Sequence, residues 1–350
     1  MCWVSLTLIG FAFGAGRVNI SDGKGDGATK SEKKRGYNRV LSSGPVAERR
    51  PLNFTGSRRE VDFEWANDPA LKNVFVSDFV WSINVFRTRK RYFEMIELLR
   101  QRNPRAIIGR YNSATCAKLS SRDSIIPVAY PLEKCSENWL LHTETGRRVP
   151  YMKRIKGTKK YREDGRYFLD MRKPEVRTAV IREMVARALN DGLDATCYDN
   201  CYWDVVPRYL PVSVEEWNKA MLVFYKEAGY EAKKNGLLCV VNVAIPAFKI
   251  PGGVRAIIPH VDGLMLETSF HPLVIERGKL QEELDAYKWA LEQSKMIFLI
   301  PRRQTLEAES FALKKVRPLD NIRQGRIFVT IGRNLDRGEE RFIHDNPLYR

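Results

Sequence analysis

Two acidic residues stand at the ends of apolar segments and are the first candidates for chemistry. Asp199 follows the apolar residues 195–198, and Glu267 follows residues 263–266. Cleavage of a glycosidic bond requires two such groups, since one carboxylate faces the oxocarbenium-like centre and the other acid protonates the departing oxygen. We therefore predict a catalytic pair, with Asp199 as nucleophile or charge-stabilising carboxylate and Glu267 as acid/base. The alternative is structural: Asp199 caps the next segment and Glu267 pairs with an arginine.

The neighbours of the two carboxyl groups predict different charge states. The amide of Asn200 is expected to keep Asp199 ionised by hydrogen bonding to its charged form. Glu267 follows Leu264, Met265 and Leu266, and this apolar setting is expected to raise its pKa, as an acid catalyst requires.

Polar and aromatic residues near other predicted strand ends are expected to bind the substrate. Asp170 either holds a sugar hydroxyl or forms a structural ion pair with Arg172, which lies two residues later on the same side of an extended segment. Trp203 provides a flat ring that suits a pyranose, although such a ring also packs well as loop cover. The predicted substrate-binding residues are Asp170, Arg172, Asn200, Trp203, Asn242, Asp78, Trp81 and Tyr111.

A strand, a helix and a second strand must position Asp199. Residues 167–171 form a short apolar run, and Pro174 suits the first turn of a helix, where its missing N–H is not needed. Apolar residues then recur at three- and four-residue spacing, which predicts a helix against a sheet. Gly192 marks the end of that helix, and Asp199 closes the next strand. Catalytic side chains occupy this position in βα barrels.

The string 168–172 (Phe-Leu-Asp-Met-Arg), followed by 192–194 (Gly-Leu-Asp) and 199–200 (Asp-Asn), resembles a group of (β/α)8-barrel glycosidases. This group contains the endo-α-1,4-polygalactosaminidases of glycoside hydrolase family 114 and related hypothetical glycosidases. The resemblance covers about 165–270 and implies a catalytic Asp after a fourth strand and a Glu on a later one. The acidic and cysteine-bearing strings of the polygalactosaminidases are absent, so the resemblance concerns the superfamily rather than that substrate.

The alternation of apolar strand-like segments with helical segments along the chain predicts a (β/α)8 TIM barrel. Expected strands begin near residues 73, 106, 167, 195, 237, 263, 296 and 326, alternating with helical segments. Ser213 and Glu216 form a capping-box signature for one of these helices. An open doubly wound sheet is the alternative architecture. A long excursion, 112–166, contains a basic run at 153–162 and is expected to carry function or form a local hairpin.

The N-terminal region predicts export. Residues 1–16 comprise an apolar run and small residues, as in a secretory signal, although the usual positive start is missing; an incomplete start or a weak anchor is the alternative. Residues 17–60 are rich in Gly, Ser, Lys and Arg and predict a disordered basic linker. The barrel is expected over 61–350. These assignments predict a secreted or extracellular protein that is exported or lies near a membrane.

The composition of the chain limits the binding partners and cofactors that are expected. The net charge of +17 occurs without a nucleic-acid-binding motif, so we expect attraction to acidic polymers or surfaces rather than sequence-specific nucleic-acid binding. No cofactor or metal is expected, because the sequence contains neither a phosphate-binding glycine loop nor a zinc-type cysteine spacing. Cys197 and Cys239 are predicted to be buried thiols, and Cys116 could pair with Cys135 after export. The expected function is cleavage of a polysaccharide; the alternative is a barrel that binds carbohydrate without cleaving it.

Overall fold

The computed structural model describes residues 49–51, 73–77, 107–119, 129–154, 161–204, 206–207, 209–243, 249–301 and 327–329, together with parts of 93–101 and 311–319. Within these ranges, some residues, Glu267 among them, are described by their backbone alone. The predicted signal, 1–16, and the predicted site residues Asp78 and Trp81 lie outside the described residues.

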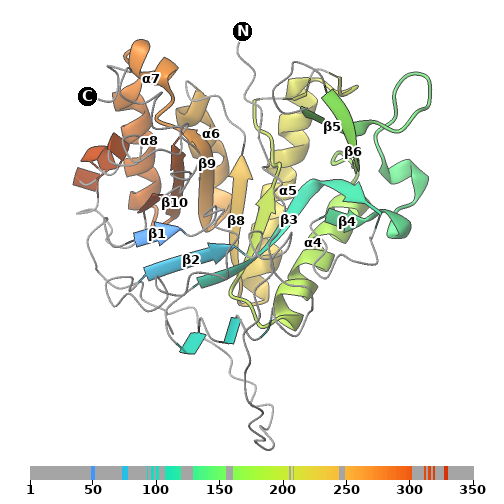
Figure 1. The fold of residues 1–350 in the computed structure, drawn as a ribbon, viewed down its shortest axis with the longest axis horizontal. Coiled ribbons are helices and arrows are strands. Elements are labelled where there is room, and N and C mark those ends of the chain that lie inside the picture. Colours follow the sequence, from blue (N-terminus) through green and yellow to red (C-terminus); the bar gives the residue numbers. More distant parts are fainter. Residues whose placement is uncertain are drawn as a thin grey trace, which may run out of the picture.

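Eight strands follow one another in parallel around the sheet (Figure 1). The two end strands, β1 and β11, contact each other, although no ladder joins them among the described residues. This arrangement confirms the predicted (β/α)8 barrel and leaves one open seam. In sheet order the strands are β1 (Arg49–Pro51), β2 (Asn73–Ser77), β3 (Ile107–Lys118), β7 (Ala195–Asp199), β8 (Leu238–Val243), β9 (Gly263–Ser269), β10 (Met296–Pro301) and β11 (Ile327–Val329).

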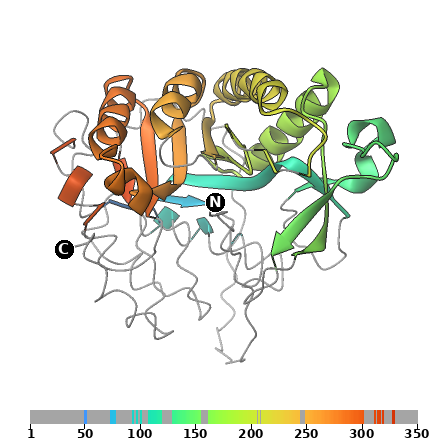
Figure 2. The same cartoon turned by 90° about the horizontal axis from the view of Figure 1, so that it is seen from above.

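Helices cover the outer face of this sheet (Figure 2). The capping box of α5 forms as predicted, with the Ser213 hydroxyl accepting from the Glu216 N–H at 3.1 Å. Pro174 begins α4, also as predicted. Among the described helices, none combines the length and the apolar character needed to cross a bilayer. The helices are α4 (Pro174–Asn190), α5 (Val214–Lys234), α6 (Ile250–Ile257), α7 (Pro272–Glu276) and α8 (Leu280–Glu292).

Strand alternation divides the buried side chains into two clusters. On β7, Tyr198 points outward and packs edge-on against Phe224 of α5, with ring centroids 5.2 Å apart. Cys197 points the other way, into the barrel interior. Asp199, two residues beyond Cys197, therefore lies on the interior side at the carboxyl end of its strand. The interior cluster consists of Ile107, Ala195, Cys197, Val240, Met265, Met296 and Phe298.

The predicted barrel strand at 167–171 is wrong. Residues Tyr161–Phe168 form β6, which pairs antiparallel with the end of β3 and with β5 (Pro150–Arg154). The barrel neighbour of β3 is instead β7. The physical reason is the length of β3, whose twelve residues extend beyond the barrel wall and offer β6 a second edge. β4 (Ala129–Pro131) also pairs with this extension.

Part of the predicted linker belongs to the sheet. Residues Arg49–Pro51 form β1, which pairs in parallel with β2. The predicted set of eight strands therefore contained one segment outside the barrel, at 167, and omitted this one. The rest of 17–60 lies outside the described residues.

Candidate active site

Side chains from β3, from the turn after β7 and from β8 hold the carboxylate of Asp199. Its Oδ1 accepts from the Asn242 amide on β8 at 2.9 Å. Its Oδ2 accepts from the Asn200 amide at 3.2 Å and from the hydroxyl of Tyr111 on β3. Asp199 as a whole residue is 6% exposed. Asn200, Asn242 and Tyr111 were all predicted as site residues, and the structure brings them together around Asp199 at the barrel mouth, the edge formed by the carboxyl ends of the parallel strands.

The environment of Asp199 raises its pKa above the ordinary value for aspartate, because burial disfavours the charged form. Hydrogen bonds from Tyr111, Asn200 and Asn242 and the charge of Arg166 act in the opposite direction. The predicted contact with Asn200 is therefore present. The hydrogen bond from Asn200 lowers the pKa of Asp199, as predicted, and burial outweighs it, so that the net shift is upward.

Asn200 fixes the turn that follows Asp199. Its φ of 57° is left-handed, a conformation that asparagine adopts more readily than most residues. Its amide also donates to Ser113 Oγ at 3.0 Å, and its carbonyl accepts from Thr115 Oγ1 at 3.1 Å. The hydroxyl of Tyr202 donates to its Oδ1 at 3.3 Å. These contacts with β3 explain how the turn holds one rigid geometry beside the carboxylate.

Helix α5 anchors the next residues of the same loop. Tyr225 donates to the Cys201 carbonyl at 2.9 Å, and the Trp217 indole donates to the Tyr202 carbonyl at 3.2 Å. The ring of Trp203 lies 6.3 Å from that of Tyr225 and is half-buried. Trp203 thus packs as loop cover, the alternative considered from the sequence, and its role as a sugar platform stays a prediction.

The lateral strands β5 and β6 supply a second group of residues that the sequence did not single out. Tyr151 donates to Asn200 Oδ1 at 3.4 Å and stacks on Phe168, with centroids 5.5 Å apart. The Arg166 guanidinium lies 3.9 Å from the centroid of the Tyr151 ring and pairs with Asp164 at 2.6 Å. The sequence signals near them were the basic run at 153–162 and the string 168–172, and neither indicated this contact with the site.

Asp170 and Arg172 form the ion pair that was the structural alternative. Arg172 Nε lies 2.8 Å from Asp170 Oδ1, and the Arg172 N–H donates to the same oxygen at 3.2 Å. Arg172 also lies 3.6 Å from Glu216 at the start of α5. The pair therefore connects the segment before α4 with the first turn of α5, and a contact of either residue with a sugar stays a prediction.

The position of Glu267 is given by its backbone alone. It lies in β9, two residues after the interior residue Met265, and its side chain is outside the described residues. The pairing of Glu267 with Asp199 therefore stays a prediction.

A small cavity lies beside Asp199 inside the barrel. Its volume is about 10 Å³, which is room for about one water molecule. A sugar ring would consequently sit outside this cavity, toward the mouth. The lining residues are Tyr111, Cys197, Tyr198, Asp199, Val240, Asn242 and Met265.

The described cysteines are free thiols. Cys197 and Cys239 are buried, as predicted, and Cys116 and Cys135 do not form the disulfide considered for an exported chain. Among the described residues, no group of three or more His, Cys, Asp or Glu could hold a metal ion.

No family model and no curated protein matches this chain. Several solved glycosidase structures are similar to it at low sequence identity. Ega3 of Aspergillus fumigatus in complex with galactosamine is 11% identical, with a TM-score of 0.46 over 84% of this chain and 96% of that chain. The α-N-acetylgalactosaminidase NagBb of Bifidobacterium bifidum, in its ligand-free form, is 9% identical, with a TM-score of 0.43 over 78% of this chain and 46% of that one. The α-galactosidase of Lactobacillus brevis is 14% identical, with a TM-score of 0.42 over 83% of this chain and 38% of that one. The chain thus spans less than half the length of the last two.

Proposed function

We propose that the protein is a glycoside hydrolase that cleaves a polysaccharide at the barrel mouth, with Asp199 and Glu267 as its two catalytic carboxyl groups. The observation that carries the proposal is the setting of Asp199. A carboxylate that ends a barrel strand on the interior side is held by donors from β3, β8 and its own turn. Catalysis requires this positional control, because small displacements of a reacting group are costly.

The chemistry assigns a separate task to each residue. Asp199, in its charged form, faces the anomeric carbon and stabilises positive charge there or attacks it. Tyr111 and Asn242 fix the direction of its two oxygens. Glu267, from β9, protonates the departing oxygen. A carboxyl separation of ~5–5.5 Å would indicate retention of anomeric configuration, and ~6.5–9.5 Å would indicate inversion.

The second candidate function is carbohydrate binding without cleavage. The observation in its favour is that Asp199 is buried beside a cavity of about 10 Å³ and has a raised pKa. A carboxyl group whose charged form is disfavoured by burial is a weaker nucleophile and would orient a ligand without attacking it. Activity measurements separate the two functions.

The proposal also concerns location and partners. The apolar stretch 1–16 supports export to an extracellular or membrane-proximal site, where polysaccharides are accessible. No cofactor enters the proposed reaction, and sequence-specific nucleic-acid binding is not part of it. Expression with a C-terminal tag, followed by detection of the tag in medium and cell fractions, tests the export component.

A screen of the full-length protein against a polysaccharide panel tests the proposal. Product release should occur with at least one polymer and should disappear in Asp199→Asn and in Glu267→Gln, while both variants keep their affinity for the polymer. Retained turnover in Asp199→Asn contradicts the assigned nucleophile. Binding of a polymer without product release by the wild-type protein, across the pH range in which it is folded, favours the binding function instead.

A further inference from the structure

The side-chain amide of Asn200 uses its full hydrogen-bonding capacity. Its nitrogen donates to Asp199 Oδ2 at 3.2 Å and to Ser113 Oγ at 3.0 Å. Its oxygen accepts from the hydroxyl of Tyr202 at 3.3 Å and from that of Tyr151 at 3.4 Å. An asparagine amide offers two hydrogens and two lone pairs, so every one of them has a partner. The amide is therefore fixed from both ends.

The hydroxyls of Tyr151 and Tyr202 select the orientation of this amide. Ser113 does not, because a serine hydroxyl donates to an oxygen as readily as it accepts from an N–H. In the opposite orientation the amide oxygen would face Asp199 Oδ2, and the two acceptors would repel each other. The two tyrosines would then accept from the amide, and each would need another acceptor for its own proton. Among the described residues, the one further partner of each hydroxyl is the other hydroxyl, at 3.4 Å.

Tyr151 reaches Asn200 from the lateral hairpin. It lies on β5, which pairs with β6, and β6 pairs with the extension of β3. The Tyr151 ring stacks on Phe168, with centroids 5.5 Å apart, and the Arg166 guanidinium lies 3.9 Å from the centroid of the same ring. Asp164 holds that guanidinium at 2.6 Å. These contacts fix the ring, so the hairpin sets the position of the hydroxyl at Asn200.

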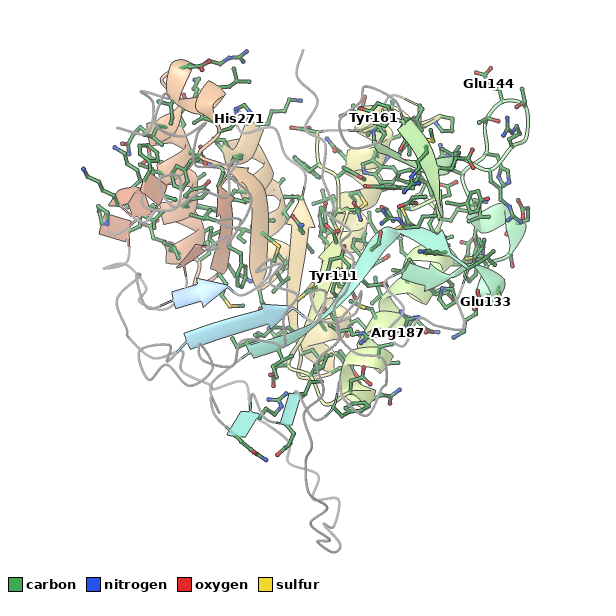
Figure 3. The ribbon with its side chains drawn as sticks, in the orientation of Figure 1. Tyr111, Glu133, Glu144, Tyr161, Arg187 and His271 are labelled. Carbon is green, nitrogen blue, oxygen red and sulfur yellow. The ribbon has the colours of Figure 1, made fainter. Side chains whose placement is uncertain are left out.

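Tyr202 reaches the same oxygen from the loop after β7. It is buried, and its carbonyl accepts from the indole of Trp217 on α5 at 3.2 Å. Figure 3 shows Tyr111, which donates directly to Asp199, near the centre of the barrel, and Tyr161, the first residue of β6, toward the upper edge of the view. One orienting hydroxyl is therefore held by α5 and the other by the hairpin.

Most of the titratable groups that interact electrostatically with Asp199 are uncharged at neutral pH. Among the described residues they are Tyr111 on β3, Tyr151 on β5, and Cys201 and Tyr202 in the loop after β7. Arg166 on β6 is the cation whose charge lowers the pKa of Asp199. The substitution Tyr151→Phe keeps the ring beside Arg166, so the position of this charge is unaffected.

We propose that Tyr151 and Tyr202 are positioning residues whose hydroxyls orient the Asn200 amide, so that its N–H holds the Asp199 carboxyl group in the direction that cleavage requires. This inference rests on the proposed function and adds the lateral hairpin to the elements that form the active site. Neither hydroxyl bonds to Asp199 itself, so both act through Asn200. Their loss lets the amide turn its oxygen toward Asp199 in part of the molecules, which disfavours the charged carboxylate.

Titration of the Asp199 carboxyl group by NMR tests the inference without a substrate. In the full-length protein labelled with ¹³C at the aspartate carboxyl carbons, the Asp199 signal is the one that disappears in Asp199→Asn. In the double variant Tyr151→Phe/Tyr202→Phe, the midpoint of this titration should rise by about one pH unit. Each single variant should give a smaller rise, and the single variants carry the test if circular dichroism shows that the double variant does not fold.

Tyr167→Phe is the matched control. Tyr167 lies on β6 of the same hairpin, and its ring contacts Arg148 rather than Asn200. Removal of its hydroxyl should leave the Asp199 midpoint unchanged. A rise of equal size in this control, or an unchanged midpoint in the double variant and in both single variants, overturns the positioning role.

Activity measurements separate this inference from the proposed function. On a polymer that the wild-type protein cleaves, kcat of the double variant should be about tenfold lower at a pH below the shifted midpoint, and KM should stay within about twofold, because the contacts with the polymer are unchanged. An unchanged pH–rate profile despite a shifted NMR midpoint overturns the role in cleavage. If the midpoint shifts and the wild-type protein cleaves no polymer of the panel, the orientation of Asp199 by the two hydroxyls stands and the proposed catalytic function fails.

Discussion

Two buried carboxyl groups, one on each side of the sheet, allow the proposed catalytic acid to be compared with a structural one. Asp199 lies inside the barrel, whereas Glu283 lies on α8, between that helix and the end of β9. Burial raises the pKa of both groups, and that of Glu283 reaches about 7. Both oxygens of Asp199 accept hydrogen bonds. In Glu283 one oxygen accepts from the Phe270 N–H at 2.9 Å and from Tyr287, and the other has no partner among the described residues.

Asp199 and Glu283 differ in the space beside their carboxyl groups. Asp199 borders a water-sized cavity inside the barrel, and its donors come from separate strands that fix its direction. Glu283 is fully enclosed, and it holds the left-handed turn at Phe270, where φ is 54°. A raised pKa alone therefore does not identify a catalytic carboxyl group, because structural burial has the same effect. The adjoining cavity and the donors from separate strands distinguish Asp199 from Glu283.

The largest expected effect is on turnover. Asp199→Asn should reduce kcat by about a thousandfold or more, because the amide can neither attack nor carry the negative charge. Glu283→Gln should leave kcat within about tenfold. Initial rates on the polymer identified by the panel, with circular dichroism to confirm folding, measure both variants. A larger loss of kcat in Glu283→Gln than in Asp199→Asn would contradict the assignment of Asp199 as the catalytic carboxyl group and Glu283 as the structural one.

The second effect is on stability. The folded-state pKa of Glu283, about 7, lies above its ordinary value of 4.5, so the folded protein holds this proton more tightly than the unfolded chain. The favourable contribution is present below about pH 4.5 and is lost as the pH rises through about 7. Glu283→Gln should therefore be more stable than wild type at about pH 8, by on the order of 3 kcal/mol, and similar to it at about pH 4.

Urea unfolding at the two pH values measures this difference. Glu282→Gln is the matched control, because Glu282 is the neighbouring residue on α8, is exposed and pairs with Lys279 at the surface. Its substitution should shift stability by less than about 1 kcal/mol at either pH. A pH-independent effect of Glu283→Gln would show that Glu283 does not titrate as its burial implies.

The third effect concerns the pH dependence of activity. Tyr111 donates to Asp199 and lowers its pKa, so Tyr111→Phe should raise that pKa further. Activity that needs the charged carboxylate would then begin at a higher pH, and kcat below that point should fall about tenfold. Tyr198→Phe removes the phenolic hydroxyl from Tyr198, the residue before Asp199. The ring of Tyr198 lies outside the barrel against Phe224. It should leave the pH–rate profile unchanged, and equal shifts in both variants would argue for a general packing effect.

The smallest effect involves a third carboxyl group, that of Asp170. Its partner Arg172 is 41% exposed, so Arg172→Gln should cost only about 0.5 kcal/mol of folding free energy. If the ion pair is its whole role, kcat and KM should stay within about twofold. A tenfold rise in KM at unchanged stability would instead support the predicted contact with the substrate.

The sequence by itself determined the local elements. Apolar periodicity, Pro174 and the Ser213 capping box predicted helices α4 and α5, and alternation with strands predicted the barrel. These features depend only on residues that are close together in the sequence, so they can be recognised without the structure. The polar ends of apolar strands also identified Asp199 and Asn242, because few polar residues occur in such segments without a partner.

Only the tertiary structure decided which strands are neighbours. The apolar run at 167–171 has the same local pattern as a barrel strand, and its pairing with the extension of β3 depends on the length of that strand rather than on its own residues. The short strand β1 carries almost no apolar signal, since its stability comes from pairing with β2. The contacts of Tyr151 and Arg166 with the site likewise depend on where β5 and β6 pack. Long-range packing also fixed the sign of the Asp199 pKa shift, because burial by distant strands outweighs the amide of the adjacent Asn200.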